Sequence, residues 1–143
     1  MDRDALTMRV GAALAGASRV RVAFVFGSQL TGNARPESDL DVGVRYRAGA
    51  SFEEREEARR TIVEELDKAL GALGERADIV DLDECNSAVA FRAIRDGLCV
   101  YESAKGQRVE AVARIQSRYA DDAPRRELFF RAAQKAFAPR SDG

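Results

Sequence analysis

Two aspartates separated by one residue, Asp39 and Asp41, have the spacing in this sequence that most clearly indicates chemistry. They lie in residues 38–44, where polar and apolar residues alternate as they do along a β-strand. Because side chains of a strand point alternately to its two faces, both carboxylates are expected on one face, where they repel each other. A divalent cation relieves this repulsion, and Mg²⁺ prefers a few carboxylate oxygens together with nucleotide phosphates.

A glycine and a serine, Gly27 and Ser28, precede the aspartates by a short segment. They follow residues 22–26, an apolar run that predicts a strand buried on both faces. A glycine at a strand end lets the backbone approach a ligand closely, and N–H groups at a following helix start are directed at phosphate. The Ser28 hydroxyl is a further donor, so this turn is predicted to bind the phosphates of a nucleotide.

A third carboxylate is expected on the predicted strand at residues 77–82, because a phosphoryl-transfer site uses one to share a metal or to take a proton from the attacking hydroxyl. The sequence offers Asp78, Asp81 and Asp83. Position parity places Asp81 and Asp83 on the face opposite to Asp78. Parity alone does not decide which of these aspartates is the third carboxylate of the site.

Gly27 and Ser28, ten intervening positions and then Asp39-x-Asp41 resemble the signature of the DNA polymerase beta-like nucleotidyltransferase superfamily. The chain is most similar to its small members, the minimal nucleotidyltransferases (MNT), over residues 20–101, and the specific motif occupies the first half of that range. In these proteins the third acid stands before two apolar residues and an Asp-Leu pair, which matches Asp78 rather than Asp81.

The resemblance implies a Mg²⁺-dependent enzyme that transfers AMP from ATP to a tyrosine of a cognate HEPN-family ribonuclease toxin, for which this chain is the antitoxin. It implies that Asp39, Asp41 and Asp78 are catalytic and hold the metal, and that Gly27 and Ser28 bind the β- and γ-phosphates. Further nucleotide-binding residues would be Arg35 and Ser38, although a loop arginine such as Arg35 can equally face water. Both an oligomer with the toxin and a homo-oligomer are compatible with this reading.

The composition excludes several other classes of function. The chain has 143 residues, no histidine and a formal net charge of -1. Without histidine, a Ser-His or Cys-His nucleophile is excluded, and two cysteines cannot form a standard zinc site. A direct nucleic-acid binder would carry a basic excess, which is absent. No signal peptide or membrane span is recognised in the sequence, so we expect a cytoplasmic protein.

The order of predicted elements indicates an α/β (α+β) fold, a small mixed sheet of about four strands flanked by helices. We expect one nucleotidyltransferase domain over residues 1–143, with a catalytic core at about 18–102 and a helical C-terminal segment at about 105–138. In that segment Val109, Val112, Gln116 and Tyr119 predict an inward stripe. Residues 128–137 are apolar on several sides, and packing into the core is slightly preferred over a partner surface.

Two other functions remain open from the sequence. The chain could be a non-catalytic antitoxin that neutralises its partner by binding alone. It could also be a small-molecule nucleotidyltransferase, acting for example on an antibiotic, that completes its substrate pocket by dimerising.

Overall fold

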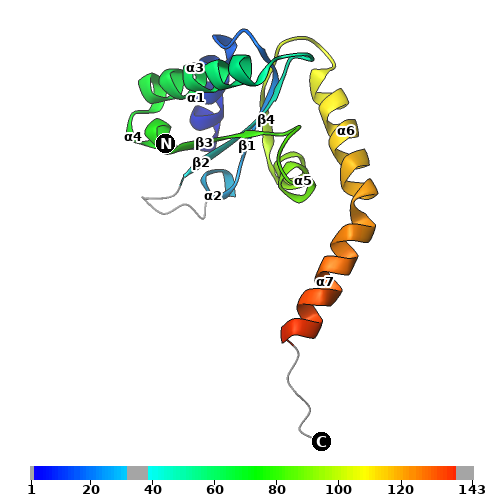
Figure 1. Ribbon diagram of the computed structural model, residues 1–143. Helices are drawn as coiled ribbons and strands as arrows, with labels where there is room; N and C mark the ends of the chain where they lie inside the picture. The colour runs from blue at the N-terminus through cyan, green and yellow to red at the C-terminus, as the bar shows by residue number, and fades with distance from the viewer. Residues whose placement is uncertain (1, 32–38, 138–143) are drawn as a thin grey trace, which may run out of the picture.

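A four-stranded sheet forms the centre of the chain in the computed structural model, which describes residues 2–31 and 39–137. The strands lie in the order β3-β2-β1-β4 (Figure 1). β1 pairs antiparallel with both β2 and β4, whereas β2 pairs parallel with β3. The mixed sheet confirms the fold class expected from the sequence. The strands are β1 (Val20–Phe26), β2 (Leu40–Tyr46), β3 (Ala77–Asp81) and β4 (Leu98–Glu102).

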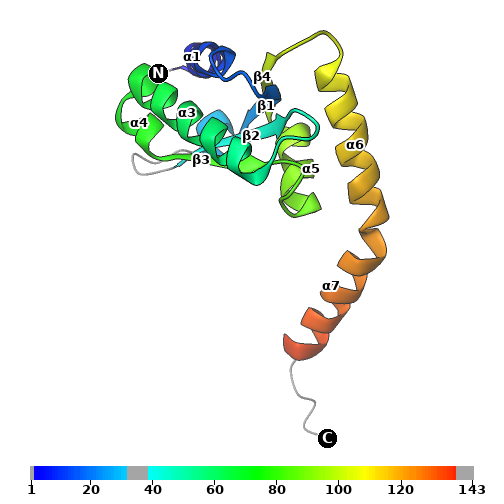
Figure 2. The same ribbon diagram turned by 45° about the horizontal axis from the view of Figure 1, so that its top comes forward.

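Helices cover both faces of this sheet and extend beyond it (Figures 1 and 2). They are α1 (Arg3–Ala15), α2 (Ser28–Thr31), α3 (Phe52–Leu70), α4 (Ala72–Glu75), α5 (Ser87–Asp96), α6 (Gln107–Asp121) and α7 (Ala123–Phe137). In the described part of the chain, no helix combines the length and the apolar character that crossing a membrane requires.

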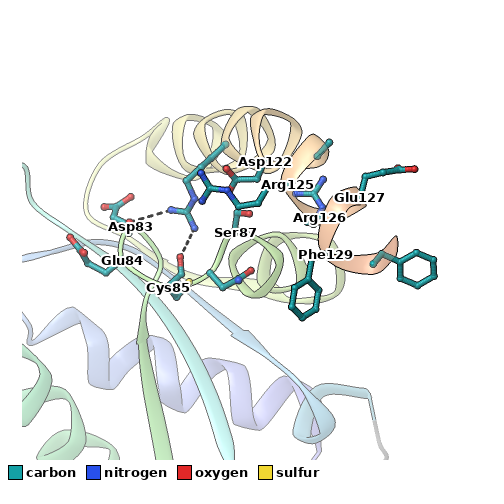
Figure 3. A pocket seen from close by; sticks show the side chains of 13 residues that line it. Asp83, Glu84, Cys85, Ser87, Asp122, Arg125, Arg126, Glu127 and Phe129 are labelled. Atoms are coloured by element: carbon teal, nitrogen blue, oxygen red, sulfur yellow. Dashed lines mark hydrogen bonds between the residues drawn. The ribbon is translucent and has the colours of Figure 1, made fainter. Parts of the chain in front are cut away.

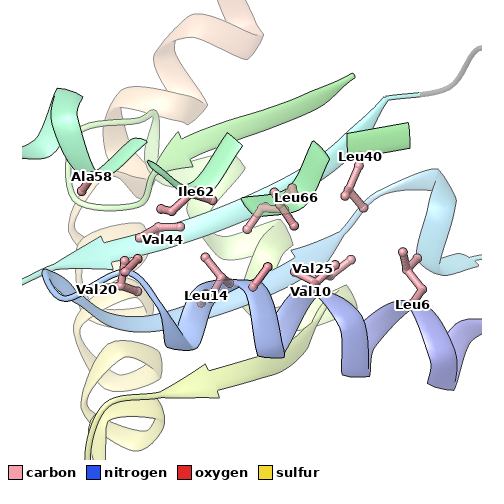
Figure 4. Packing of buried hydrophobic residues seen from close by; sticks show 14 of the residues in the cluster. Leu6, Val10, Leu14, Val20, Val25, Leu40, Val44, Ala58, Ile62 and Leu66 are labelled. Carbon is pink, nitrogen blue, oxygen red and sulfur yellow. The ribbon is translucent and has the colours of Figure 1, made fainter. Parts of the chain in front are cut away.

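The first face of the sheet packs against α1 and α3 (Figure 4). Leu14 of α1, Val25 and Val44 of the sheet, and Ile62 and Leu66 of α3 are completely buried there. The i, i+4 spacing of Ile62 and Leu66 places both on the inward face of α3. A capping box starts this helix, with hydrogen bonds of 3.1 Å in both directions between Ser51 and Glu54, a pattern that the Ser-x-x-Glu spacing of the sequence predicts.

The second face of the sheet packs against α5 and α6. Alternate residues of β1, Val22, Phe24 and Phe26, lie on this face. Ala90 of α5 and Ala111 of α6 are fully buried against them. β1 is therefore covered on both sides, as its continuous apolar run predicts.

The helix α3 ends at Leu70. Gly71 has φ +61°, a conformation that stops a helix and that L-residues avoid. The backbone then forms the single turn α4, which contains Gly74, before entering β3.

The inward stripe predicted for α6 is wrong at Val109 but correct in part, because Val112 packs half-buried against the second face of the sheet and Tyr119 stacks on Phe91. Val109 is 63% exposed, and the buried residues of α6 are instead Ala111 and Ile115. Small residues at the contact let α6 approach α5 closely, so the packing partner rather than the largest side chains selects the inward face.

Core packing of residues 128–137 is also wrong, because α7 has no buried residue. Phe129 and Phe130 are 77% and 62% exposed, and Phe137 is 87% exposed. α6 and α7 together form an arm that runs past the body of the molecule (Figures 1 and 2). α5 and α6 already cover the second face of the sheet, which leaves α7 no apolar surface to pack on.

Candidate active site

Asp41 and Asp78 lie beside each other on the neighbouring parallel strands β2 and β3. In-register residues of adjacent strands point to the same face, with the strands about 4.8 Å apart. Leu40 and Val42 pack into the cluster beneath α1 and α3, so Asp41, between them, faces the α5 side of the sheet. The structure thus places two of the three predicted carboxylates together.

Asp39 stands just before β2 and is exposed. Its negative charge acts on Asp41. Burial is the main cause that raises the pKa of Asp41; the charge of Asp78 raises this pKa further, Arg92 lowers it and Asp39 raises it. In the described part of the chain, no lysine or arginine forms an ion pair with any of these three carboxylates. Their mutual repulsion is therefore left for a cation to relieve.

Gly27 packs directly beneath the Asp41 carboxylate. Its φ is +86°, and a Cβ at this position would collide with Oδ2 of Asp41 and lie 3.2 Å from Cγ. The preceding residue, Phe26, is the cross-strand partner of Asp41. Ser28 starts α2, and the N–H of Leu30 donates to the Gly27 carbonyl at 3.1 Å. The predicted phosphate-binding turn and the acidic pair therefore form one site at the end of β1.

The other acidic candidates lie elsewhere. Asp81 is in register with Val44 and faces α3, where its Oδ2 accepts a hydrogen bond from Arg55 at 3.1 Å. Asp83 lies past the end of β3, so the parity expected for it does not apply, and its carboxylate binds the buried Arg45 at 3.0 Å. The two remaining predicted nucleotide-binding residues, Arg35 and Ser38, lie outside the described residues.

The chemistry of this donor set fits Mg²⁺, since all three side chains offer hard oxygens and the described carboxylates lie close enough for Asp78 and Asp39 to raise the pKa of Asp41. These side chains do not form a complete metal site by themselves. Within residues 2–31 and 39–137, no three acidic, cysteine or histidine side chains are grouped closely enough to hold a metal. Water and phosphate oxygens complete the coordination in sites of this kind.

Three arginines on the α5 and α6 side of the sheet were not predicted from the sequence, and of these Arg92 lies near the acidic pair. Arg92 of α5 lies with its guanidinium carbon 5.7 Å from the centre of the Phe26 ring. Arg45 is 4% exposed, and Arg118 donates to the carbonyls of Leu82 and Cys85 at 2.8 and 2.9 Å. The helical spacing of α5 could have indicated that Arg92 faces away from Ala90 and Ala93, but not which strand it overlies.

A cavity of about 930 Å³ lies between the β3–α5 loop and the arm, and none of Asp39, Asp41 and Asp78 lines it (Figure 3). Phe129 and Phe130 of α7 line it. Where α6 meets α7, Arg126 lies 3.5 Å from the centre of the Tyr119 ring, which in turn stacks on Phe91 of α5. These contacts fix the base of the arm against α5. Both cysteines, Cys85 and Cys99, are free.

The chain is similar to known proteins in sequence pattern and in fold. The family described as "Polymerase beta, Nucleotidyltransferase" matches residues 10–106. No curated protein sequence matches the chain.

Several solved structures are similar in fold. A toxin–antitoxin crystallised with AMP-PNP has a TM-score of 0.68 at 18% identity, with 93% of this chain and 99% of that chain covered. A complex of a tri-AMPylated HEPN toxin from Shewanella oneidensis with its MNT antitoxin has a TM-score of 0.59 at 16% identity, covering 90% and 97%. The toxin–antitoxin MntA–HepT has a TM-score of 0.60 at 16% identity, with the same coverage.

Proposed function

Because the chain belongs to the polymerase beta nucleotidyltransferase family and is thus a nucleotidyltransferase, we propose that it transfers AMP from ATP to a tyrosine of a cognate HEPN-family toxin and acts as its antitoxin. The observation that carries the proposal is the pairing of Asp41 with Asp78 on adjacent strands, directly over Gly27. Relatives in fold include a complex with AMP-PNP and a tri-AMPylated HEPN toxin bound to its antitoxin.

In this proposal Asp39 and Asp41 hold Mg²⁺, and Asp78 joins them. A bound Mg²⁺ supplies positive charge where the phosphoryl transition state spreads negative charge. The backbone at Gly27 and Ser28 binds the β- and γ-phosphates, and Arg35 and Ser38 are the further proposed nucleotide contacts. The site thus orients the α-phosphate for attack.

The reaction is an in-line displacement. The tyrosine oxygen forms a bond to the α-phosphorus, and the bond from that phosphorus to the bridging oxygen of the β-phosphate breaks, so that pyrophosphate leaves. The phenolic proton passes to Asp78, which lies beside Asp41 at the edge of the site and is exposed to an incoming acceptor.

The arm is the proposed docking surface for the toxin. Leu128, Phe129, Phe130 and Phe137 are all more than 60% exposed on one helix. The same helix carries more basic than acidic side chains, so a partner with an apolar groove rimmed by acidic residues would complement it.

Intact-mass spectrometry tests the proposed reaction. The purified protein is incubated with Mg-ATP and the product of the neighbouring reading frame, and both chains are weighed. We expect the neighbour to gain one or more adenylyl units, and the gain to disappear with Asp39→Asn or Asp41→Asn. Asp67→Asn, on the exposed face of α3, is the matched control and should leave transfer unchanged.

A complex without a mass gain would support a binding-only antitoxin instead, and AMP transfer to an aminoglycoside without any protein partner would support the small-molecule enzyme. Retained transfer in both aspartate variants would refute the assignment of the carboxylates.

The docking surface has its own test. Phe129→Ser removes an apolar side chain that nothing in the described chain covers, so it should weaken toxin binding at least tenfold without lowering thermal stability. Met8→Ser, at a 71% exposed position of α1, is the control. Equal affinities of the two variants would exclude α7 as the interface.

A further inference from the structure

Arg92 is an exposed arginine of α5 on the side of the sheet that carries the acidic pair. Within the described chain, its guanidinium forms no ion pair or hydrogen bond. It lies over the Phe26 ring, with its central carbon 5.7 Å from the ring centroid. Arg95, one turn later on the same helix, is different: it pairs with Asp96 at 2.8 Å and lies over Phe91. Arg92 therefore keeps its donors available.

The position of Arg92 follows from its contact with Phe26. Phe26 is the last residue of β1, immediately before Gly27, and it is the cross-strand partner of Asp41. The guanidinium therefore lies over the point where the phosphate-binding turn begins.

We propose that Arg92 binds the β- and γ-phosphates of the nucleoside triphosphate, which Gly27 and Ser28 approach from the end of β1. The inference rests on the proposed function, since it takes the triphosphate to lie on this turn. A guanidinium presents two parallel N–H donors that match two phosphate oxygens, and it is the cation suited to such bidentate binding. It lies within range of Asp41 without pairing to it, which leaves the fork available for an anion on the nucleotide.

A second role for Arg92 makes a different prediction. If it served only as a counter-ion for Asp41, its removal would affect ATP, ADP and AMP equally, and it would increase the affinity of the carboxylates for Mg²⁺ by removing a repelling charge. If it binds the two terminal phosphates, its removal must weaken the binding of ATP strongly and the binding of ADP less, and it must leave the binding of AMP unchanged.

Isothermal titration calorimetry of the purified protein with ATP, ADP and AMP, at fixed MgCl₂ and without any acceptor, separates the two roles. We expect Arg92→Gln to raise the Kd for ATP by about tenfold to a hundredfold, the loss typical of a charge-assisted hydrogen bond, and to leave the Kd for AMP unchanged. Arg92→Lys keeps the charge but not the fork and should recover part of the affinity. Arg95→Gln is the matched control and should bind all three nucleotides like the wild type.

Three results decide the matter. Equal Kd values for ATP in Arg92→Gln and the wild type, or equal losses for ATP and AMP, overturn the assignment of Arg92 while the proposed function stands. Absence of nucleotide binding by the wild type overturns both. Because Arg92 is exposed, thermal unfolding of the variants should match that of the wild type, which excludes misfolding as the cause of lost affinity.

Discussion

Replacing Gly27 by alanine should separate the stability of this protein from its function. Gly27 has φ +86°, where an L-residue is strained by about 1–2 kcal/mol. The added Cβ would also collide with the Asp41 carboxylate. That carboxylate is the end of a side chain and can rotate away, so the collision should cost little stability. The rotation would, however, move an oxygen out of the site.

The structure offers a matched control for the backbone strain alone. Gly106 has φ +93°, and a Cβ there meets nothing within 4 Å. Gly106→Ala should therefore lose about the same 1–2 kcal/mol as Gly27→Ala, without affecting the site. Gly49→Ala, at φ +80° and also in open space, is a second control.

Two assays on the same variants test this reasoning. Urea unfolding should give similar losses of stability for Gly27→Ala and Gly106→Ala. The rate of AMP transfer should fall about a hundredfold in Gly27→Ala alone, because a displacement of about 1 Å in a catalytic group is enough for such a loss. A wild-type transfer rate in Gly27→Ala would show that the Asp41 carboxylate does not depend on the space above Gly27.

Three further predictions concern the scaffold. Burial and the charge of Asp81 raise the pKa of Tyr46 to about 12. Because the folded protein then holds this proton more tightly than the unfolded chain, stability should be intact below pH 10 and decrease by roughly 2–3 kcal/mol between pH 10 and 12, a slope that Tyr46→Phe removes in urea titrations. Ile62→Ala leaves a cavity at a completely buried position and should cost about 2–5 kcal/mol in urea unfolding, whereas Arg60→Ala on the exposed face should cost under about 0.5. Arg118→Met removes the donors to the Leu82 and Cys85 carbonyls and should lower the Tm by several degrees. An unchanged Tm would contradict this prediction.

Local patterns in the sequence predicted much of the fold. Apolar residues that recur every two residues identify strands, and those that recur every three to four residues identify helices, because the recurring residues lie on the side of the element that is covered. The capping box at Ser51 and Glu54 needed only three residues of spacing to be recognised. The inward face of α6 could not be predicted in this way, because Ala111 and Ile115 were selected by the helix that packs on them.

The arm shows the same limit. Four large apolar side chains on α7 would be buried if an uncovered sheet face were available, and nothing local in residues 128–137 indicates that α5 and α6 already occupy it. Hydrophobicity predicts that such a surface is covered by something, but the partner is a property of the whole assembly.

For the site, the sequence by itself predicted that Asp39 and Asp41 share a face and that Gly27 and Ser28 stand at a strand end, because both predictions follow from alternation and turn chemistry within a few residues. The structure places Gly27 directly after β1 and Asp39 directly before β2. Only the tertiary structure decided that Asp78 is the neighbour of Asp41. It also decided that Asp81 pairs with Arg55 of α3, on the other face of the sheet. It also decided that Arg92 lies over Phe26. The physical reason is that alternation fixes the direction of a side chain from its own strand, whereas the pairing and register of two strands, and the helix that covers them, are set by contacts between residues far apart in the chain.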